Sequence, residues 1–156
     1  MTRKGRISKA DYEALAAFRY ALRRFLRFAE EGARAAGLTP QQHQLLLAVK
    51  GHPERDWLSV TELAEALQIR HHTAVGLVDR CEQAELIRRV ADPRDRRQVR
   101  VLLTARGEGI LGRLSTRNRR ELDTLRGALR LPVDERRAPG SARPQRRGRT
   151  EARGRA

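Results

Sequence analysis

Apolar residues recur at steps of three and four along the first part of the chain, which is the spacing of one face of an α-helix. Ser8 and Asp11 have the spacing of a capping box at the start of this segment, and Gly37 is placed to end it. We therefore predict a long amphipathic helix over residues 8–36. Its apolar stripe consists of Tyr12, Leu15, Phe18, Leu22, Phe25, Leu26 and Ala29.

A second long stripe follows Thr104, which is a candidate helix N-cap. Its apolar residues repeat at close to heptad spacing, and Pro132 is placed to end the helix. This pattern predicts a long helix over residues 104–131 with Ile110, Leu111, Leu114, Leu122, Leu125 and Leu129 on its apolar side.

Shorter elements lie between the two long helices. The run from Thr39 to Gln42 combines an N-cap, a proline at the first helical position and a glutamine at the third, and predicts a helix that stops near Gly51. Ser59 and Glu62 have capping-box spacing and open a short helix, and after a tight connection a further helix is expected over residues 71–84. Two short helices joined by a turn of three or four residues are the helix-turn-helix pattern.

Two predicted strands, at residues 86–90 and 99–103, flank a charged turn that contains Asp92 and Pro93. A hairpin directly after the second helix of the pair is the order of a winged helix. We thus predict a mainly α fold with a small β wing, in one domain at residues 8–131. Its winged helix-turn-helix lobe covers about 39–103, between long terminal helices at 8–36 and 104–131.

The charge of the chain indicates a polyanionic partner. Its 34 lysines and arginines outnumber its 19 acidic residues, which gives a formal net charge of +15. Residues 136–156 are rich in Arg, Gly, Pro, Ala and Ser without apolar periodicity, and we expect this tail to be disordered. The body without the tail is still basic.

Several classes of protein find no support in the sequence. No apolar run approaches the roughly 20 residues of a membrane helix, and the single cysteine, Cys81, favours a reducing compartment, so a cytoplasmic protein without a membrane partner is expected. No phosphate-binding glycine loop, nucleophile with its base or metal-ligand spacing is present, so we expect no enzyme activity, metal or cofactor. Cys81 lies on the apolar side of its helix, which favours a core residue over a redox sensor.

Candidate contacts with nucleic acid lie on the helix at 71–84 and on the hairpin. Ala74, Val75, Val78 and Cys81 are the expected buried side of that helix. The expected outward side has His71, His72 and Thr73 toward base edges, Arg80 toward a phosphate, and Gly76 and Leu77 beside them. The candidates on the hairpin are Arg94, Asp95, Arg96 and Arg97. The alternatives are solvated histidines, a threonine and glycine that only permit packing, and an ordinary salt-bridged loop.

The ordered motifs of the chain resemble the MarR family of bacterial transcriptional regulators. They are Leu38-Thr39-Pro40-Gln41-Gln42, Thr61-Glu62-Leu63-Ala64, Leu77-Val78-Asp79-Arg80, and Asp92-Pro93-Arg94-Asp95-Arg96-Arg97 followed by Leu103-Thr104. The resemblance implies a homodimer with interleaved terminal helices, which suits the two long apolar stripes. It also implies a helix at 71–84 in the major groove, Arg97 in the minor groove, and Asp95 orienting the wing. Half-sites would then lie one helical turn apart, roughly 34 Å.

The sequence departs from the family at two places. Arg70 stands where many relatives have a serine that caps the recognition helix, so we expect the cap to come from elsewhere or to be weak. Pro132 and the arginine-rich segment replace the continued last helix of relatives, which bears on the strength of the dimer.

The resemblance further implies a small aromatic effector in a cleft between the dimer helices and the lobe. Phe18, Phe25, His43 and Trp57 are the candidates for such a cleft, and core or interface packing is the alternative for them. The predicted function is a sequence-specific, ligand-responsive repressor that binds a palindromic promoter site as a homodimer. Two alternatives stay open: a non-specific or architectural nucleic-acid-binding protein driven by charge, and a protein-interaction module with a winged fold.

Overall fold

The structure, a computed structural model, describes residues 7–95 and 97–128. These residues form five helices and a three-stranded sheet, so the predicted mainly α fold with a small β wing is confirmed. The order is α1 (Lys9–Ala35), α2 (Pro40–Lys50), β1 (Trp57–Leu58), α3 (Val60–Ala66), α4 (His71–Gln83), β2 (Ile87–Ala91), β3 (Val99–Leu103) and α5 (Ala105–Ala128).

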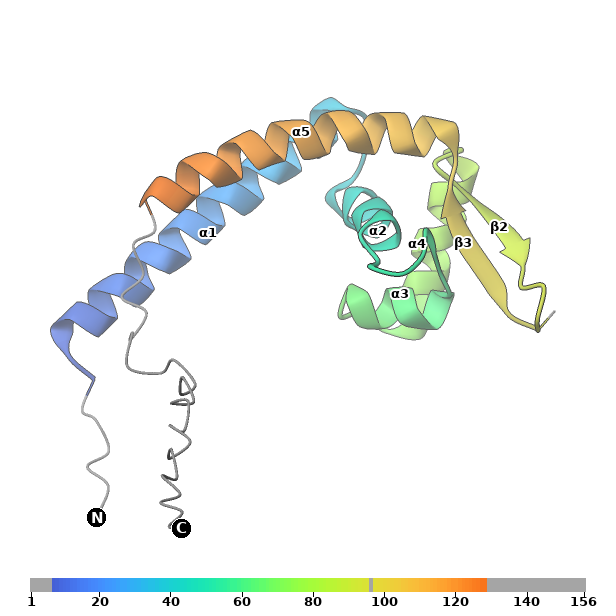
Figure 1. The fold of residues 1–156 in the computed structure, drawn as a ribbon, viewed down its shortest axis with the longest axis horizontal. Coiled ribbons are helices and arrows are strands. Elements are labelled where there is room, and N and C mark those ends of the chain that lie inside the picture. Colours follow the sequence, from blue (N-terminus) through green and yellow to red (C-terminus); the bar gives the residue numbers. More distant parts are fainter. Residues whose placement is uncertain (1–6, 96, 129–156) are drawn as a thin grey trace, which may run out of the picture.

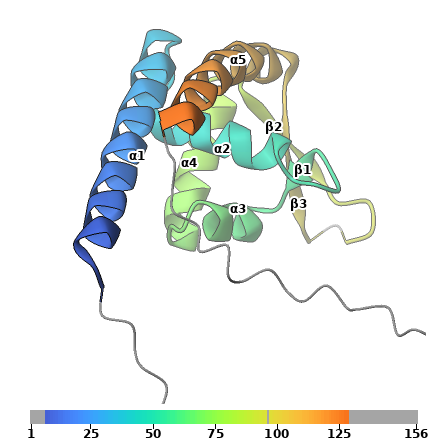
Figure 2. The same cartoon turned by 60° about the vertical axis from the view of Figure 1, so that its left-hand side comes forward.

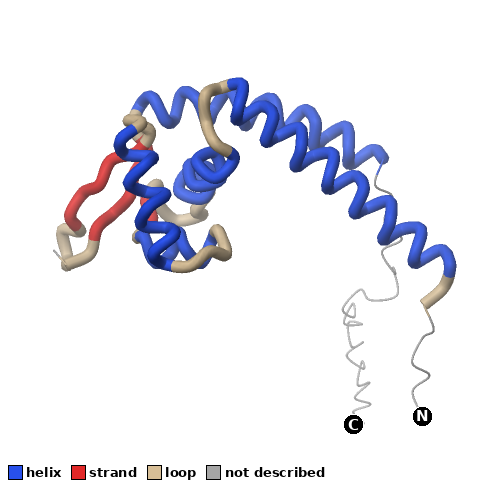
Figure 3. Tube along the Cα trace, turned by 180° about the vertical axis from the view of Figure 1, so that it is seen from behind, coloured by secondary structure: helices blue, strands red, loops and turns tan. Residues whose placement is uncertain are grey.

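The long helices α1 and α5 pack against each other and form an arm that extends away from the rest of the molecule (Figure 1). The lobe made of α2, α3, α4 and the sheet lies at one end of this arm, where α2 contacts both long helices (Figure 2). The hairpin of β2 and β3 lies at the outer edge of the lobe (Figure 3). Leu129, Pro132 and the arginine-rich tail at 136–156 are outside the described residues.

Local capping chemistry begins the helices where the sequence predicted. Three helices start with a capping box. In each box the hydroxyl of the N-cap residue accepts a hydrogen bond from the backbone amide three residues later, and the side chain of that later residue accepts one from the backbone amide of the N-cap residue. Thr104 also accepts from the amide of Gly107 at 3.1 Å, which confirms it as the cap of α5. The three boxes are Ser8–Asp11, Thr39–Gln42 and Ser59–Glu62.

The turn between α3 and α4 depends on one residue in the left-handed region. Gln68 has φ 54°, and the amide of Ile69 reaches back to the carbonyl of Ala64 at 2.9 Å. This is the hydrogen-bond pattern that closes a helix C-terminus and redirects the chain. It fixes the angle between the two helices of the helix-turn-helix.

The sheet has the order β1-β3-β2 with antiparallel pairing throughout. The β2–β3 hairpin was predicted, and its register places Ile87 opposite Leu103 and Ala91 opposite Val99. The two-residue strand β1 was not predicted, because so short a strand depends on its distant partner β3 rather than on a local pattern. β1 ties the loop before α3 to the hairpin, since Trp57 pairs with Leu102.

The core lies in the lobe and at the base of the arm. It joins side chains from α2, α3, α4, the sheet and the first half of α5, including Leu45, Leu63, Val78, Val101 and Leu111. Among the described helices, none combines the length and the apolar character that a membrane span requires.

The apolar stripe of α1 is mostly exposed. The buried residues of this 27-residue helix are Ala21, Gly32 and Ala33, all small. Tyr12, Leu15 and Leu22 expose 59%, 54% and 43% of their surface. A stripe of this size on one face of a helix is unusual for a surface that stays in water.

Candidate nucleic-acid interface

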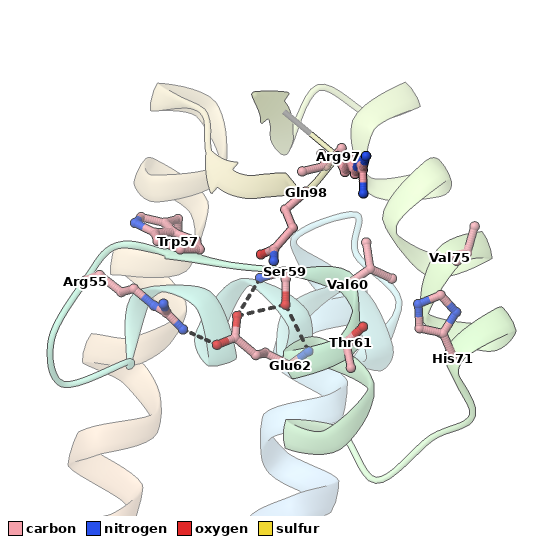
Figure 4. A pocket seen from close by; sticks show the side chains of 11 residues that line it. Arg55, Trp57, Ser59, Val60, Thr61, Glu62, His71, Val75, Arg97 and Gln98 are labelled. Carbon is pink, nitrogen blue, oxygen red and sulfur yellow. Dashed lines mark hydrogen bonds and ion pairs between the residues drawn. The ribbon is translucent and has the colours of Figure 1, made fainter. Parts of the chain in front are cut away.

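A groove with a cavity volume of about 600 Å³ lies between α3, α4 and the hairpin. Figure 4 shows its walls: Thr61 comes from α3, His71 and Val75 come from α4, and Arg97 comes from the turn of the hairpin. Residues far apart in the sequence thus meet on one face of the lobe. Imidazole, hydroxyl and guanidinium groups can all bond to phosphates or base edges.

The face of α4 that borders the groove differs from the prediction at two positions. His71, His72 and Arg80 are exposed, and Thr73 and Gly76 are half-buried, as an outward face requires. Leu77 is only 1% exposed and packs in the core, so its prediction as a DNA contact is wrong. Val75 was predicted to be buried but is 37% exposed and lines the groove.

The reason for both corrections is the helix period. Leu77 lies three residues after Ala74 and one turn before Cys81, both of which are fully buried, whereas Val75 lies one turn after the exposed His71. Because Val75 lies four residues after His71, the helical spacing could have predicted that Val75 shares the exposed face. An apolar side chain at this position can contact a thymine methyl group.

The start of α4 has no side-chain cap. Arg70 is the N-cap residue, and within the described residues its side chain makes no capping hydrogen bond, in line with the weak capping expected there. The first amides of α4 therefore point out of the helix without a capping acceptor, next to the groove. A helix start of this kind attracts anions through its free N–H groups and the helix dipole.

The turn of the hairpin, residues 92–98, is organised by two aspartates. Asp92 is 6% exposed and accepts hydrogen bonds from the backbone amides of Arg94 (2.7 Å) and Asp95 (3.3 Å). Arg100 Nε donates a hydrogen bond to the other carboxylate oxygen of Asp92 at 2.7 Å. This hydrogen bond, together with the one from the backbone amide of Arg94, lowers the pKa of Asp92 to about 2. Asp95 in turn accepts from the amide of Arg97 at 3.0 Å.

This arrangement leaves Arg94 and Arg97 on the outside of the turn. Arg94, Asp95 and Arg97 are exposed, and Arg97 also lines the groove, while Arg96 is outside the described residues. The backbone bond from Arg97 to Asp95 is consistent with an orienting role for that aspartate. Arginine side chains on a rigid turn match phosphate oxygens and narrow minor grooves.

Arg89 joins the hairpin to α4. Its guanidinium contacts Asp79 and bonds Glu82 at 2.6 Å, and its backbone amide donates to Glu82 at 3.0 Å. Both carboxylates belong to α4, whereas Arg89 belongs to β2. The strand and the helix are therefore held in a fixed relation by charge-assisted bonds.

The four residues predicted to share an effector cleft do not lie together. Phe25 and His43 line one small pocket of about 110 Å³ between α1, α2 and α5, whereas Trp57 lines the groove beside the hairpin. Phe18 is 37% exposed on the arm and is not among the residues of either site. The sequence placed Phe18 and Phe25 on α1 and His43 on α2 but assigned Trp57 to no element, and it had no information on which of these residues meet.

The small pocket contains two buried polar atoms that lack a hydrogen-bond partner among the described residues, His43 Nε2 and Asn118 Oδ1. Burial lowers the pKa of His43 below its ordinary value. Buried polar atoms of this kind are normally paired with protein, water or ligand.

Cys81 is fully buried, and burial raises the pKa of its thiol to about 11, which confirms it as a core residue. A thiol with this pKa carries almost no thiolate at neutral pH and reacts slowly with oxidants. Across residues 7–95 and 97–128, no three His, Cys, Asp or Glu side chains gather as a metal site would need.

Known proteins share this lobe. The sequence model of the MarR family matches residues 36–98, which run from the end of α1 to the turn of the hairpin. This lobe belongs to the MarR family. We call residues 36–98 the MarR lobe; they contain α2, β1, the helix-turn-helix, β2 and the turn of the hairpin, and they end before β3.

Individual relatives extend the similarity beyond the MarR lobe. TtmR of Methylorubrum extorquens (strain PA1), an HTH-type transcriptional regulator, is 33% identical over 129 residues, which are 83% of this chain and 59% of TtmR. A MarR family protein from Bacillus stearothermophilus has a similar structure, with a TM-score of 0.68, 25% identity, and coverage of 85% of this chain and 88% of its own. The chain spans about half the length of the curated relatives that it matches.

One similar structure contains nucleic acid. It is a mutant of S. aureus MepR bound to an oligodeoxyribonucleotide, with a TM-score of 0.59, 24% identity, and coverage of 80% of this chain and 86% of that one. At 24% identity this similarity shows that the two proteins share a fold.

Proposed function

We propose that this protein is a sequence-specific DNA-binding transcriptional regulator that acts as a homodimeric repressor on a palindromic promoter site. The observation that carries the proposal is the groove between α4 and the hairpin, with His71 and Val75 on one side and Arg97 on the other. The MarR lobe supports it, and so does the formal net charge of +15.

The groove has the character expected for one strand of a duplex backbone. A recognition helix in the major groove and a wing in the adjacent minor groove are separated by a single sugar–phosphate strand, which the groove would hold. In this arrangement His71, His72 and Thr73 face base edges, and Arg80 and the free amides at the start of α4 face phosphates. Arg97 enters the minor groove while Asp95 orients it, and Arg94 and Arg96 are proposed as further DNA contacts of the same turn.

The proposed dimer follows from the exposed stripe of α1. Tyr12, Leu15, Leu22 and Leu26 are 43–59% exposed. Full burial of an exposed apolar side chain is worth about 1.5–3 kcal/mol, so burial of the exposed half of each by a second copy would gain roughly 0.7–1.5 kcal/mol. Leu122 of α5 is 40% exposed and adds to the apolar surface of the arm. We extend the proposal to the domain boundaries: a regulator domain at 8–131 and an arginine-rich segment at 136–156 that binds DNA non-specifically.

A small aromatic effector is a further part of the proposal, at the pocket of Phe25 and His43. His43 Nε2 in this pocket would bond a ligand hydroxyl or carboxylate, and Asn118 Oδ1 would accept a hydrogen bond from a ligand hydroxyl. The 110 Å³ of one chain is smaller than a typical ligand site of roughly 300–1,000 Å³, so the second subunit would have to complete it. Benzoate and phenol are suitable probes, with the rise in melting temperature of wild-type protein and of a Phe25→Ala variant as the readout.

The test of the main proposal is a selection of bound sites from fragmented genomic DNA, followed by titration of the recovered site and of a scrambled duplex. Sequence-specific regulators bind their sites roughly 10³–10⁷-fold more tightly than random DNA at physiological salt. A ratio near one with a steep salt dependence would contradict the proposal and favour the architectural alternative. Absence of binding to either duplex would favour a protein-interaction module.

A further inference from the structure

The only tryptophan of the chain lies between two arginines next to the DNA-facing groove. The guanidinium carbon of Arg55 is 4.0 Å from the centroid of the Trp57 ring, and that of Arg100 is 4.1 Å from it. Both arginine side chains are largely shielded from water, at 28% and 22% exposure. Cation–π contacts gain strength when the cation is desolvated in this way.

Each arginine also pairs with a carboxylate, and the two carboxylates organise different parts of the interface. Arg100 bonds Asp92 at 2.7 Å, and Asp92 holds the hairpin turn through the amides of Arg94 and Asp95. Arg55 contacts Glu62. The Glu62 carboxylate accepts a hydrogen bond from the backbone amide of Ser59 at 2.8 Å and thereby fixes the start of α3. Figure 4 shows Arg55, Trp57 and Glu62 along the wall of the groove.

The position of Arg55 depends on the ring. Its Nε atom is buried and, among the described residues, has no hydrogen-bond partner. The contact with Glu62 and the indole are therefore the interactions that hold this guanidinium. Within the described residues, the backbone pairing that joins this loop to β3 is limited to the two residues of β1.

We propose that Arg55, Trp57 and Arg100 form a bridge that fixes the hairpin turn relative to the start of α3, which makes Trp57 a positioning residue for Arg97. The proposal rests on the DNA-binding function proposed above. Arg89 ties β2 to α4, but the turn lies beyond Arg89 in the hairpin, and without a second tie Arg97 could still move relative to α3. The bridge instead holds the turn and the helix-turn-helix at the spacing that one duplex requires.

The first test uses the full chain without DNA. Trp57→Leu removes the aromatic face and keeps a smaller apolar side chain, and we expect the amides of Arg94 and Asp95 to exchange hydrogen about three- to tenfold faster, the range of a partly buried cation–π contact. Trp57→Phe keeps an aromatic face and is expected to retain slow exchange. Tyr20→Leu, an exposed aromatic of α1, is the matched control and should leave these amides unchanged. Unchanged exchange in Trp57→Leu would overturn the bridge.

The second test separates a bridge from local packing. Arg55→Gln alters the far end of the bridge, and we expect it also to speed exchange at Arg94 and Asp95, which it does not touch. The double variant with Trp57→Leu should exchange no faster than Trp57→Leu alone. Additive effects, or no effect of Arg55→Gln on the turn, would show that the two ends are independent. Arg55→Gln also keeps the test decisive if Trp57→Leu fails to fold.

The third test connects the bridge to DNA. We expect Trp57→Leu to weaken binding to the selected site about three- to tenfold in the wild-type background and by less than twofold when Arg97 is already alanine. Equal losses in both backgrounds would mean that Trp57 acts on DNA independently of Arg97 and would overturn its positioning role. If wild-type protein shows no preference for any site, the proposed function fails, while the exchange tests still decide whether the bridge exists.

Discussion

Leu77 lies inside the helix that we propose to read DNA, yet its side chain is 1% exposed and belongs to the core. Leu77→Ala removes buried apolar atoms and leaves a cavity. Such Leu→Ala changes at buried sites lower the free energy of unfolding by about 2.7–5 kcal/mol. A domain has only about 5–15 kcal/mol of stability in total, so this change would remove a large part of it. For a chain of this length we expect the melting temperature to fall by roughly 10 °C.

Val75→Ala is the matched control, because Val75 is on the same helix, is 37% exposed and lines the groove. We expect it to change stability by less than about 1 kcal/mol, the range of ordinary surface substitutions. Its effect should appear in DNA affinity instead. Thermal unfolding followed by circular dichroism, at one protomer concentration for all variants, measures the first quantity, and titration of the selected duplex well below both melting temperatures measures the second.

The two variants should therefore separate. Leu77→Ala should melt early but bind DNA within about threefold of wild type while folded, since its side chain does not reach the surface, and Val75→Ala should melt normally and bind more weakly. A Leu77→Ala protein that melts like wild type and loses DNA binding would refute this assignment of the faces of α4.

Three further outcomes are expected. Arg97→Ala should weaken specific DNA binding by about 1–3 kcal/mol in titrations at physiological salt, whereas Arg106→Ala on α5 should not; equal affinities would refute the minor-groove assignment. Leu22→Glu places a charge in the exposed stripe of α1 and should shift the protein from dimer to monomer in light scattering, and an unchanged mass would place the dimer contact elsewhere. Because burial lowers the pKa of His43 below 6.5, the unfolded chain binds this proton more readily. Stability should therefore be complete above about pH 6.5 and decline below it, and His43→Gln should flatten that decline in urea unfolding curves.

Much of the fold could be predicted from the sequence because its determinants are local. The capping residues Ser8, Thr39 and Ser59 each begin a helix where expected, since one hydroxyl and one amide three residues later suffice. The hairpin was also predictable, because β2 and β3 are neighbours in the sequence and the charged turn between them is distinctive.

The errors arise where distant segments decide the outcome. β1 exists only because Trp57 and Leu58 pair with β3, and no pattern of two residues can predict that. Trp57 was a candidate for the effector cleft that the family resemblance implies, but it lies at the groove between Arg55 and Arg100. The orientation of α4 was predicted to within about one helical position, which was enough to exchange Leu77 and Val75.

The central claim is that α4 occupies the major groove and the hairpin the adjacent minor groove of one duplex. Methylation protection with dimethyl sulfate tests it directly, because the reagent attacks guanine N7 in the major groove and adenine N3 in the minor groove. On the selected site we expect protected guanines in two half-sites about one helical turn apart, with protected adenines flanking them, and loss of the adenine protection alone in Arg97→Ala. Protection that is uniform along the duplex, or adenine protection that survives Arg97→Ala, would contradict the account.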